Sequence, residues 1–195
     1  MNPRAVKTAN QYGAGAQSIR FGANDTYYQA AREGRVVEGK FVPLSELYPK
    51  FRAEELERCI RIPVDGPPPP ELDEILQLIA ANPDIYLNTG HVSPAEALRL
   101  VDLAGEYGIG RLLVASAVTK EASLEELQYM AAKGAFIEYT LAAYTHTTPI
   151  PKTHYYVERE YASIDEGMDL GQTGSLRLAA EQIRAPKLAG RPMTV

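Results

Sequence analysis

The sequence is poor in three features that many functional classes require: cysteine, clustered basic residues and long apolar runs. Cys59 is the only cysteine, which excludes an intrachain disulfide and a cysteine-based metal knuckle. The net charge is −5 and no basic run occurs, so nonspecific binding of nucleic acid is not expected. No run of about 18 apolar residues could cross a membrane, and the first residues lack the apolar core of a signal peptide. We therefore expect a soluble, cytoplasmic protein with no nucleic-acid or membrane partner.

Two common site patterns are also absent. Cys59 lies near the expected end of a helix and has no histidine pattern around it, so catalysis by a nucleophilic thiol is not expected. Gly13 and Gly15 lack the third glycine and the preceding strand of a dinucleotide-binding loop. We interpret these two glycines as a helix stop.

What the sequence does contain is a repeated strand–helix pattern. Its clearest copy begins at 84–89, a short run of β-branched and aromatic residues that predicts a buried strand. Gly90 then turns the chain. Ser93 and Glu96 have the spacing of a capping box and predict a helix over 94–107.

The same order recurs along the chain. Ser123 and Glu126 form a second capping box, which predicts a helix over 123–133. Strand starts recur at about 25-residue intervals, the spacing of parallel strands joined by crossover helices. The expected strands are at 17–21, 84–89, 111–116 and 135–140, and further helices are expected from Pro3 and from Pro70 to Ala81.

This pattern predicts an α/β fold, either a partial (β/α) barrel or an open parallel sheet with crossover helices. A complete eight-unit barrel usually needs about 250 residues, more than this chain provides. We expect a single domain over 1–182 with an insertion at about 22–70 that contains a polar helix at 45–58, followed by an extended C-terminal arm at 183–195. A partial barrel leaves open edges and an uncovered apolar face, so we also expect a homo-oligomer or a complementing subunit.

Several residues that could carry chemistry stand at the expected ends of strands or in the loop that follows them. His91 lies between a strand and a capped helix, although its ring could simply donate to a backbone carbonyl. Glu138 lies within an apolar strand and points either into the barrel or toward solvent at an edge. Asp169 is flanked by glycines and could be a turn former. His146 and His154 lie in a long loop at 141–165, where surface positions are the alternative.

Four strings in the sequence resemble the later strands of amidohydrolase-like TIM-barrel proteins, a group classed as metal-dependent hydrolases, and a fifth resembles a segment in mid-chain of that group. The distinctive strings are Asn-Thr-Gly-His-Val-Ser at 88–93 and Asp-Leu-Gly-Gln at 169–172, and the weaker ones lie at 2–6, 112–116 and 133–138. The resemblance covers roughly residues 1–20 and 70–175 and matches the C-terminal half of that family.

The resemblance implies roles for individual residues. His91 would be a metal ligand after the fifth strand, Glu138 a pocket carboxylate on the seventh, and Asp169 the residue that binds metal and takes a proton from the attacking water. Two departures weigh against a complete site. Ser116 stands where relatives would carry a second histidine, and no histidine precedes His91, so the His-x-His pair of the first strand is missing.

A hydrolytic zinc or similar divalent ion needs about three protein ligands and an open position. His91, Glu138 and Asp169 would supply them, and His146 or His154 could replace the missing histidines. We therefore expect a metal-dependent hydrolase that acts on a small C–N or C–O bonded substrate. The alternative is a catalytically degenerate half-barrel paralogue that serves as a binding or oligomeric assembly subunit.

Overall fold

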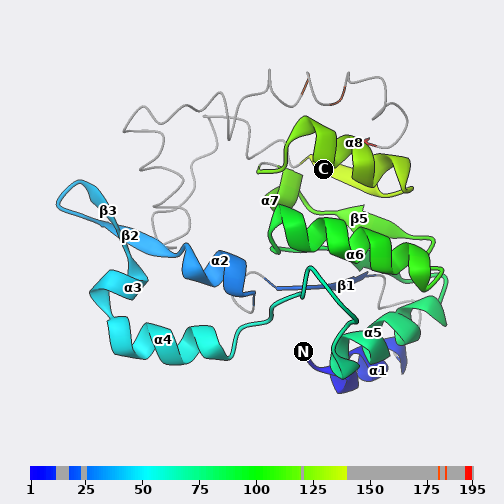
Figure 1. The fold of residues 1–195 in the computed structure, drawn as a ribbon, viewed down its shortest axis with the longest axis horizontal. Coiled ribbons are helices and arrows are strands. Elements are labelled where there is room, and N and C mark those ends of the chain that lie inside the picture. The colour runs from blue at the N-terminus through cyan, green and yellow to red at the C-terminus, as the bar shows by residue number, and fades with distance from the viewer. Residues whose placement is uncertain are drawn as a thin grey trace.

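Short parallel strands form the main sheet, in the order β1-β4-β5-β6-β7 (Figure 1). The strands are β1 (Ser18–Arg20), β4 (Tyr86–Asn88), β5 (Leu112–Val114), β6 (Phe136–Tyr139) and β7 (Pro192–Thr194). The four predicted strands are confirmed, each shorter than predicted, and β7 lies within the predicted C-terminal arm. The computed structural model describes residues 1–11, 18–22, 26–119, 121–139, 180, 183 and 192–194.

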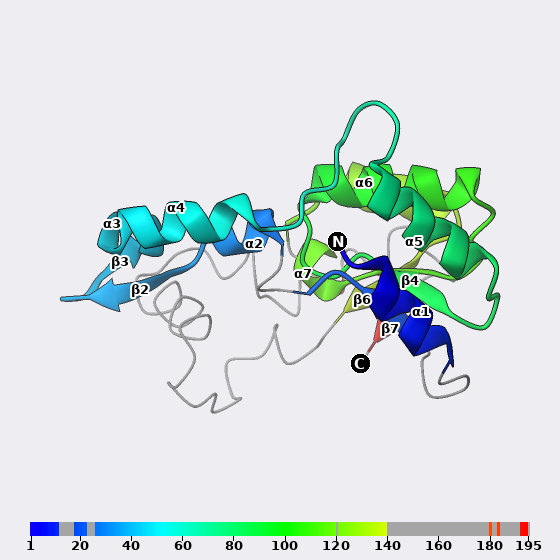
Figure 2. The ribbon, with the colours of Figure 1, turned by 90° about the horizontal axis from the view of Figure 1, so that it is seen from below.

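The crossover helices lie together on one face of this sheet (Figure 2). They are α5 (Pro70–Ala80), α6 (Pro94–Glu106) and α8 (Leu124–Ala132), and α1 (Pro3–Gln11) packs beside α5. A short helix, α7 (Ser116–Thr119), follows β5 directly. None of the helices in the described part of the chain has the length and apolar character needed to span a membrane.

The sheet is open over the residues that the structure describes. β1 forms one edge and β7 the other, and no described strand joins them to close a barrel. The prediction of an α/β fold with a partial, open parallel sheet and crossover helices is therefore confirmed.

Both predicted capping boxes are present. The Ser93 hydroxyl accepts from the Glu96 N–H at 3.2 Å, and the Glu96 carboxylate accepts in return from the Ser93 N–H at 2.8 Å. Ser123 and Glu126 make the same reciprocal pair at 3.2 and 2.7 Å. Each box satisfies amide groups that have no partner in the first turn of a helix, which explains why α6 and α8 begin where the sequence predicted.

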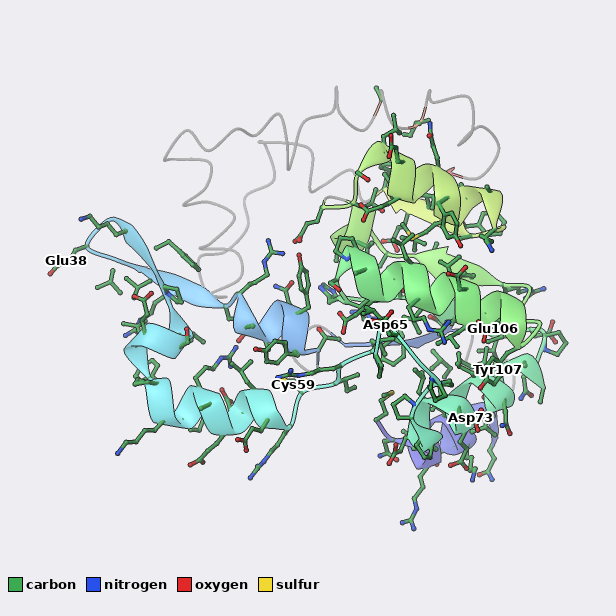
Figure 3. The ribbon with its side chains drawn as sticks, in the orientation of Figure 1. Glu38, Cys59, Asp65, Asp73, Glu106 and Tyr107 are labelled. Carbon is green, nitrogen blue, oxygen red and sulfur yellow. The ribbon has the colours of Figure 1, made fainter. Side chains whose placement is uncertain are left out.

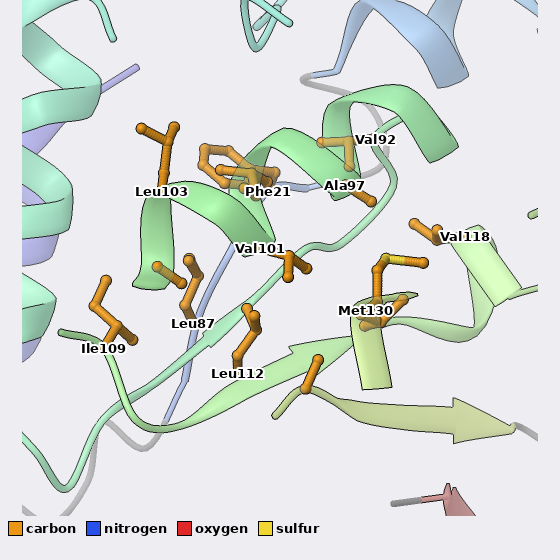
Figure 4. Packing of buried hydrophobic residues seen from close by; sticks show 14 of the residues in the cluster. Phe21, Leu87, Val92, Ala97, Val101, Leu103, Ile109, Leu112, Val118 and Met130 are labelled. Atoms are coloured by element: carbon orange, nitrogen blue, oxygen red, sulfur yellow. The ribbon is translucent and has the colours of Figure 1, made fainter. Parts of the chain in front are cut away.

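The hydrophobic core lies between the sheet and these helices (Figure 4). Leu87 and Leu112 project from adjacent strands and are register partners, so their side chains lie on the same face. Val101 on α6 and Met130 on α8 cover them. Alternate strand residues therefore point into this core, as the period of two requires.

Residues 26–60 form a lobe between β1 and α5. Its elements are α2 (Tyr27–Ala31), the antiparallel hairpin of β2 (Gly34–Val37) and β3 (Lys40–Pro43), α3 (Leu44–Leu47) and α4 (Pro49–Glu57). The predicted helix at 45–58 is thus two helices. The break falls at Tyr48, whose φ of −138° and ψ of 62° leave the helical region because Pro49 follows it.

A buried ion pair lies at the centre of the lobe. Arg52 is 7% exposed, and its guanidinium donates to Glu33, to Glu55 at 2.7 Å and to the Ala30 carbonyl. Desolvation opposes the charge, but the hydrogen bond with Glu55 and the negative charge of Glu33 outweigh it and raise the pKa of Arg52. Arg52 therefore stays charged, and it joins α4 to the end of α2.

The chain turns at Gly90 where β4 leaves the sheet. Gly90 has φ +63°, and a Cβ built on it would lie 1.9 Å from the Phe21 carbonyl oxygen at the end of β1. Glycine is required here because its backbone adopts a positive φ without strain and because it has no Cβ to overlap the Phe21 carbonyl.

Glu96 joins the lobe to α6 in addition to capping it. Its second carboxylate oxygen accepts from the buried Ile62 N–H at 2.9 Å, just beyond the end of the lobe. The corresponding oxygen of Glu126 in the second box has no such tertiary partner among the described residues. Glu126 is therefore a control for Glu96, because both cap a helix but only Glu96 also bonds a residue outside its own helix.

Gly90→Ala should lower the free energy of unfolding by about 3 kcal/mol or more, because the new Cβ is strained and also overlaps the backbone of β1. Gly108→Ala is the control, since Gly108 has φ +71° but nothing within 4 Å of its Cβ position. It should cost roughly 1 kcal/mol. Urea denaturation of the two variants measures the difference, and equal costs would contradict the close approach at Gly90.

Glu96→Ala should destabilise the protein by about 3 kcal/mol, because two backbone N–H groups lose their acceptor and one of them is buried. Glu126→Ala should cost only about 1 kcal/mol, since it removes a capping contact alone. Chemical denaturation checks both. Similar values for the two variants would show that the Ile62 contact contributes little.

Candidate functional site

The carboxyl ends of β1, β4 and β5 meet at one edge of the sheet because the strands are parallel. Ligands of open α/β proteins usually bind at that edge. The residues that follow the strands there are Phe21 after β1, the segment 89–91 after β4 and Ser116 after β5. The lobe is attached at the same edge: Thr26 bonds the His91 carbonyl, and Tyr28 and Arg32 on α2 bond Glu121, which follows α7.

His91 is held at this edge through its backbone. Its N–H donates to the Phe21 carbonyl at 3.3 Å, and its own carbonyl accepts from the Thr26 hydroxyl at 2.9 Å. Thr26 is 1% exposed and belongs to the lobe. The half-buried His91 is therefore fixed between the end of β1 and the start of α2.

Two residues just before His91 shape the turn that presents it. The Asn88 side-chain oxygen accepts from the Gly90 N–H at 2.8 Å. Thr89 N–H donates to the Leu113 carbonyl at 3.0 Å, and the Thr89 hydroxyl accepts from the Ala115 N–H at 3.0 Å. Sequence reasoning included both residues in the string 88–93 but gave neither a role, although an Asn two positions before a Gly is typical of a side-chain-stabilised turn.

Glu138 projects from the face of the sheet opposite the helices. Its neighbours Ile137 and Tyr139 are fully buried in the core, whereas Phe136 on the same side as Glu138 is 37% exposed. β7 pairs with β6 on its outer side, with Glu138 opposite Met193. Glu138 therefore stands on an interior strand, and the alternative that it lies at a sheet edge is wrong.

His91 and Glu138 lie near the same level of the sheet. The register aligns Asn88 with Leu113 and Leu113 with Phe136, so Glu138 stands level with the position two residues after Asn88. One strand, β5, separates the two. His91 follows the turn at Gly90, and its N–H bonds Phe21 at the end of β1, on the side of β4 away from β6, so the register alone brings the two residues into no direct contact.

The other sequence candidates do not add to this pair. Asp169, His146 and His154 lie outside the described residues. Ser116 is the first residue of α7. Across the described ranges, no group of three or more His, Cys, Asp or Glu side chains could hold a metal ion. The described residues therefore supply two candidate ligands, fewer than the roughly three that a catalytic zinc site needs.

A second polar cluster joins α2 to the segment after α7. The Tyr28 hydroxyl and the Arg32 guanidinium both donate to the Glu121 carboxylate. Arg32 also lies over the Tyr28 ring, 4.7 Å from its centroid. The cluster attaches the lobe to the sheet edge. Because it is partly exposed, we expect it to contribute little to the free energy of unfolding.

Polar contacts elsewhere have structural explanations. Figure 3 shows Asp73 and Tyr107 close together where α5 meets the C-terminal end of α6. The Tyr107 hydroxyl donates to Asp73, and this hydrogen bond, with desolvation and the charge of Asp73, raises the pKa of Tyr107. Cys59 lies beyond the end of α4, and its thiol donates to the Glu55 carbonyl at 3.6 Å.

Comparison with known proteins gives one match. No curated protein and no solved structure matches the chain. A sequence family described only as a family of unknown function matches residues 1–138, a range that contains the lobe, His91 and Glu138 but none of Asp169, His146 and His154. Since this match spans more than half of the sequence, the chain belongs to that family, DUF6282.

Proposed function

We propose that this chain is a metal-dependent hydrolase of the amidohydrolase type, acting on a small C–N or C–O bonded substrate. The observation that supports the proposal best is the position of His91. It stands at the carboxyl edge of a parallel sheet, on a turn that requires Gly90, with its backbone held by Phe21 and Thr26. Binding residues need this kind of rigid support, because a ligand that shifts by an ångström loses much of its effect.

In this proposal the His91 imidazole and the Glu138 carboxylate are two ligands of a divalent ion such as zinc. Asp169, His146 and His154, which the sequence indicates, are the candidates for the remaining positions. When bound, such an ion would acidify a water molecule to a pKa of about 7. The protein's own residues would hold the ion at the carboxyl edge, and the lobe would limit access of water from the side of α2.

A second function has its own support. Ser116 opens α7 where a hydrolase of this type would carry a second histidine, and Phe136 is partly exposed on the helix-free face of the sheet. These features favour a chain that binds another subunit and has lost catalysis. The function would then lie in the assembly, with the sheet face as the contact surface.

Metal analysis of the purified protein tests the hydrolase. Wild-type protein should retain about one zinc or similar ion after dialysis, and His91→Ala should reduce the affinity by more than about tenfold. Glu138→Gln should weaken binding as well, whereas Glu125→Gln, at an exposed position on α8, should not. Cys59→Ser controls for binding at the thiol. A metal-free wild type, or equal binding in all the variants, would end the hydrolase proposal.

Sedimentation analysis tests the assembly function. A dimer or larger complex is expected, and Phe136→Asp should dissociate it, because a carboxylate buried in an interface without a partner is costly. Val64→Asp, at a 47% exposed position in the loop before α5, should leave the complex intact. A stable monomer at all concentrations would rule this function out.

A further inference from the structure

Gln29 is a buried polar residue whose side-chain nitrogen is not hydrogen-bonded within the described part of the fold. It lies on α2 and is 5% exposed. Its side-chain nitrogen is fully buried and has no hydrogen-bond partner within the part of the chain that the structure describes. Buried amides are almost always hydrogen-bonded, so an unused one requires an explanation.

The contacts of α2 define where Gln29 points. Thr26, at the start of the helix, bonds the His91 carbonyl, and Tyr28 and Arg32 both reach Glu121. With 3.6 residues per turn, Gln29 lies between the side of the helix that carries Tyr28 and Arg32 and the side that begins with Thr26.

The sheet edge near α2 is polar, and two of its hydroxyl groups are bonded within the fold. His91 follows β4, and Glu121 follows α7 and β5, so the side of α2 that carries Gln29 lies between its attachments to these two segments. The Thr89 hydroxyl accepts from Ala115 N–H, and the Thr119 hydroxyl donates to the Ala115 carbonyl at 3.2 Å. These groups are occupied by the fold itself, whereas the Gln29 amide is available.

We propose that Gln29 is a ligand-binding residue, whose amide nitrogen donates to a carbonyl or carboxylate oxygen of a small molecule bound at the carboxyl edge of β4 and β5. The identification of this molecule as the substrate rests on the proposed function, whereas the binding role of Gln29 does not. An amide donor suits such a ligand because it recognises an oxygen acceptor without adding charge. The fold keeps the donor unpaired until the ligand arrives.

Gln29→Met tests the assignment, because methionine keeps the length of the side chain and removes the hydrogen-bond donor. Acetate and acetamide are the probes, as the smallest carboxylate and carboxamide. Saturation-transfer NMR should detect binding of at least one of them to the wild type, and Gln29→Met should weaken that binding by about tenfold. Gln128→Met, at a half-buried position on α8, should leave it unchanged.

The unfolding temperature of Gln29→Met distinguishes a binding role from a structural one, because the two roles predict changes of opposite sign. Without probe, Gln29→Met should unfold at a temperature equal to or above that of the wild type, because it removes an unsatisfied buried amide. A clear drop would show that the fold uses the amide and would overturn the assignment. A wild type that binds neither probe, or a Gln29→Met variant that binds them equally well, would overturn it too.

The metal measurements keep this inference separate from the proposed function. Gln29→Met should retain the ion that His91→Ala loses. If the wild type binds no metal but binds a probe in a Gln29-dependent manner, the hydrolase fails and the binding role stands. If metal binding depends on His91 while probe binding ignores Gln29, the hydrolase stands and the binding role fails.

Discussion

The contact between Gly90 and the backbone of Phe21 is the constraint on which the carboxyl edge of this protein depends. At that point two chain segments that are far apart in the sequence approach so closely that even a methyl group could not fit between them. β1 and β4 are neighbours in the sheet, and Arg20 and Asn88 are their last paired residues. The left-handed turn at Gly90 brings His91 to the end of β1, where its N–H bonds the same Phe21 carbonyl that excludes the methyl group.

The lobe depends on the same contact. Its first described residue, Thr26, bonds the carbonyl of His91, so the lobe begins where the turn after β4 ends. At its far end, the chain is held again by the Ile62 contact with Glu96 in the first turn of α6. Both attachments involve the segment 91–96. A single short stretch therefore supports the sheet, the helix and the lobe, and changes there should affect all three.

Local signals in the sequence predicted the fold well because they act over a few residues. The capping boxes at Ser93 and Ser123 give the starts of α6 and α8, and the apolar alternation in 135–140 gives the buried face of β6. The strands came out too long, because residue pattern marks where a strand lies but does not mark its first and last paired residue. The break at Tyr48 was also visible in principle, since Pro49 restricts it, but the polar composition of 45–58 concealed it.

The candidate site was less predictable because its contacts are tertiary. Position relative to a strand end was enough to single out His91. Nothing local indicates that Thr26 reaches its carbonyl or that Gln29 is buried, since both follow from how the lobe packs on the sheet. A residue such as Gln29 is ordinary in a helix and becomes informative only when its surroundings are known. The three remaining candidates lie outside the described residues, so the prediction that they join His91 and Glu138 stays open to experiment.

The Thr89 hydroxyl gives the seam between β4 and β5 an unusual last rung. In a regular parallel ladder the Ala115 N–H would donate to the Thr89 peptide oxygen, yet here it donates to the Thr89 side chain instead. A peptide oxygen is fixed by the planar backbone, whereas a hydroxyl can rotate about its χ1 bond. The last rung of this seam therefore depends on the rotamer of one buried threonine, whose own N–H still bonds the Leu113 carbonyl.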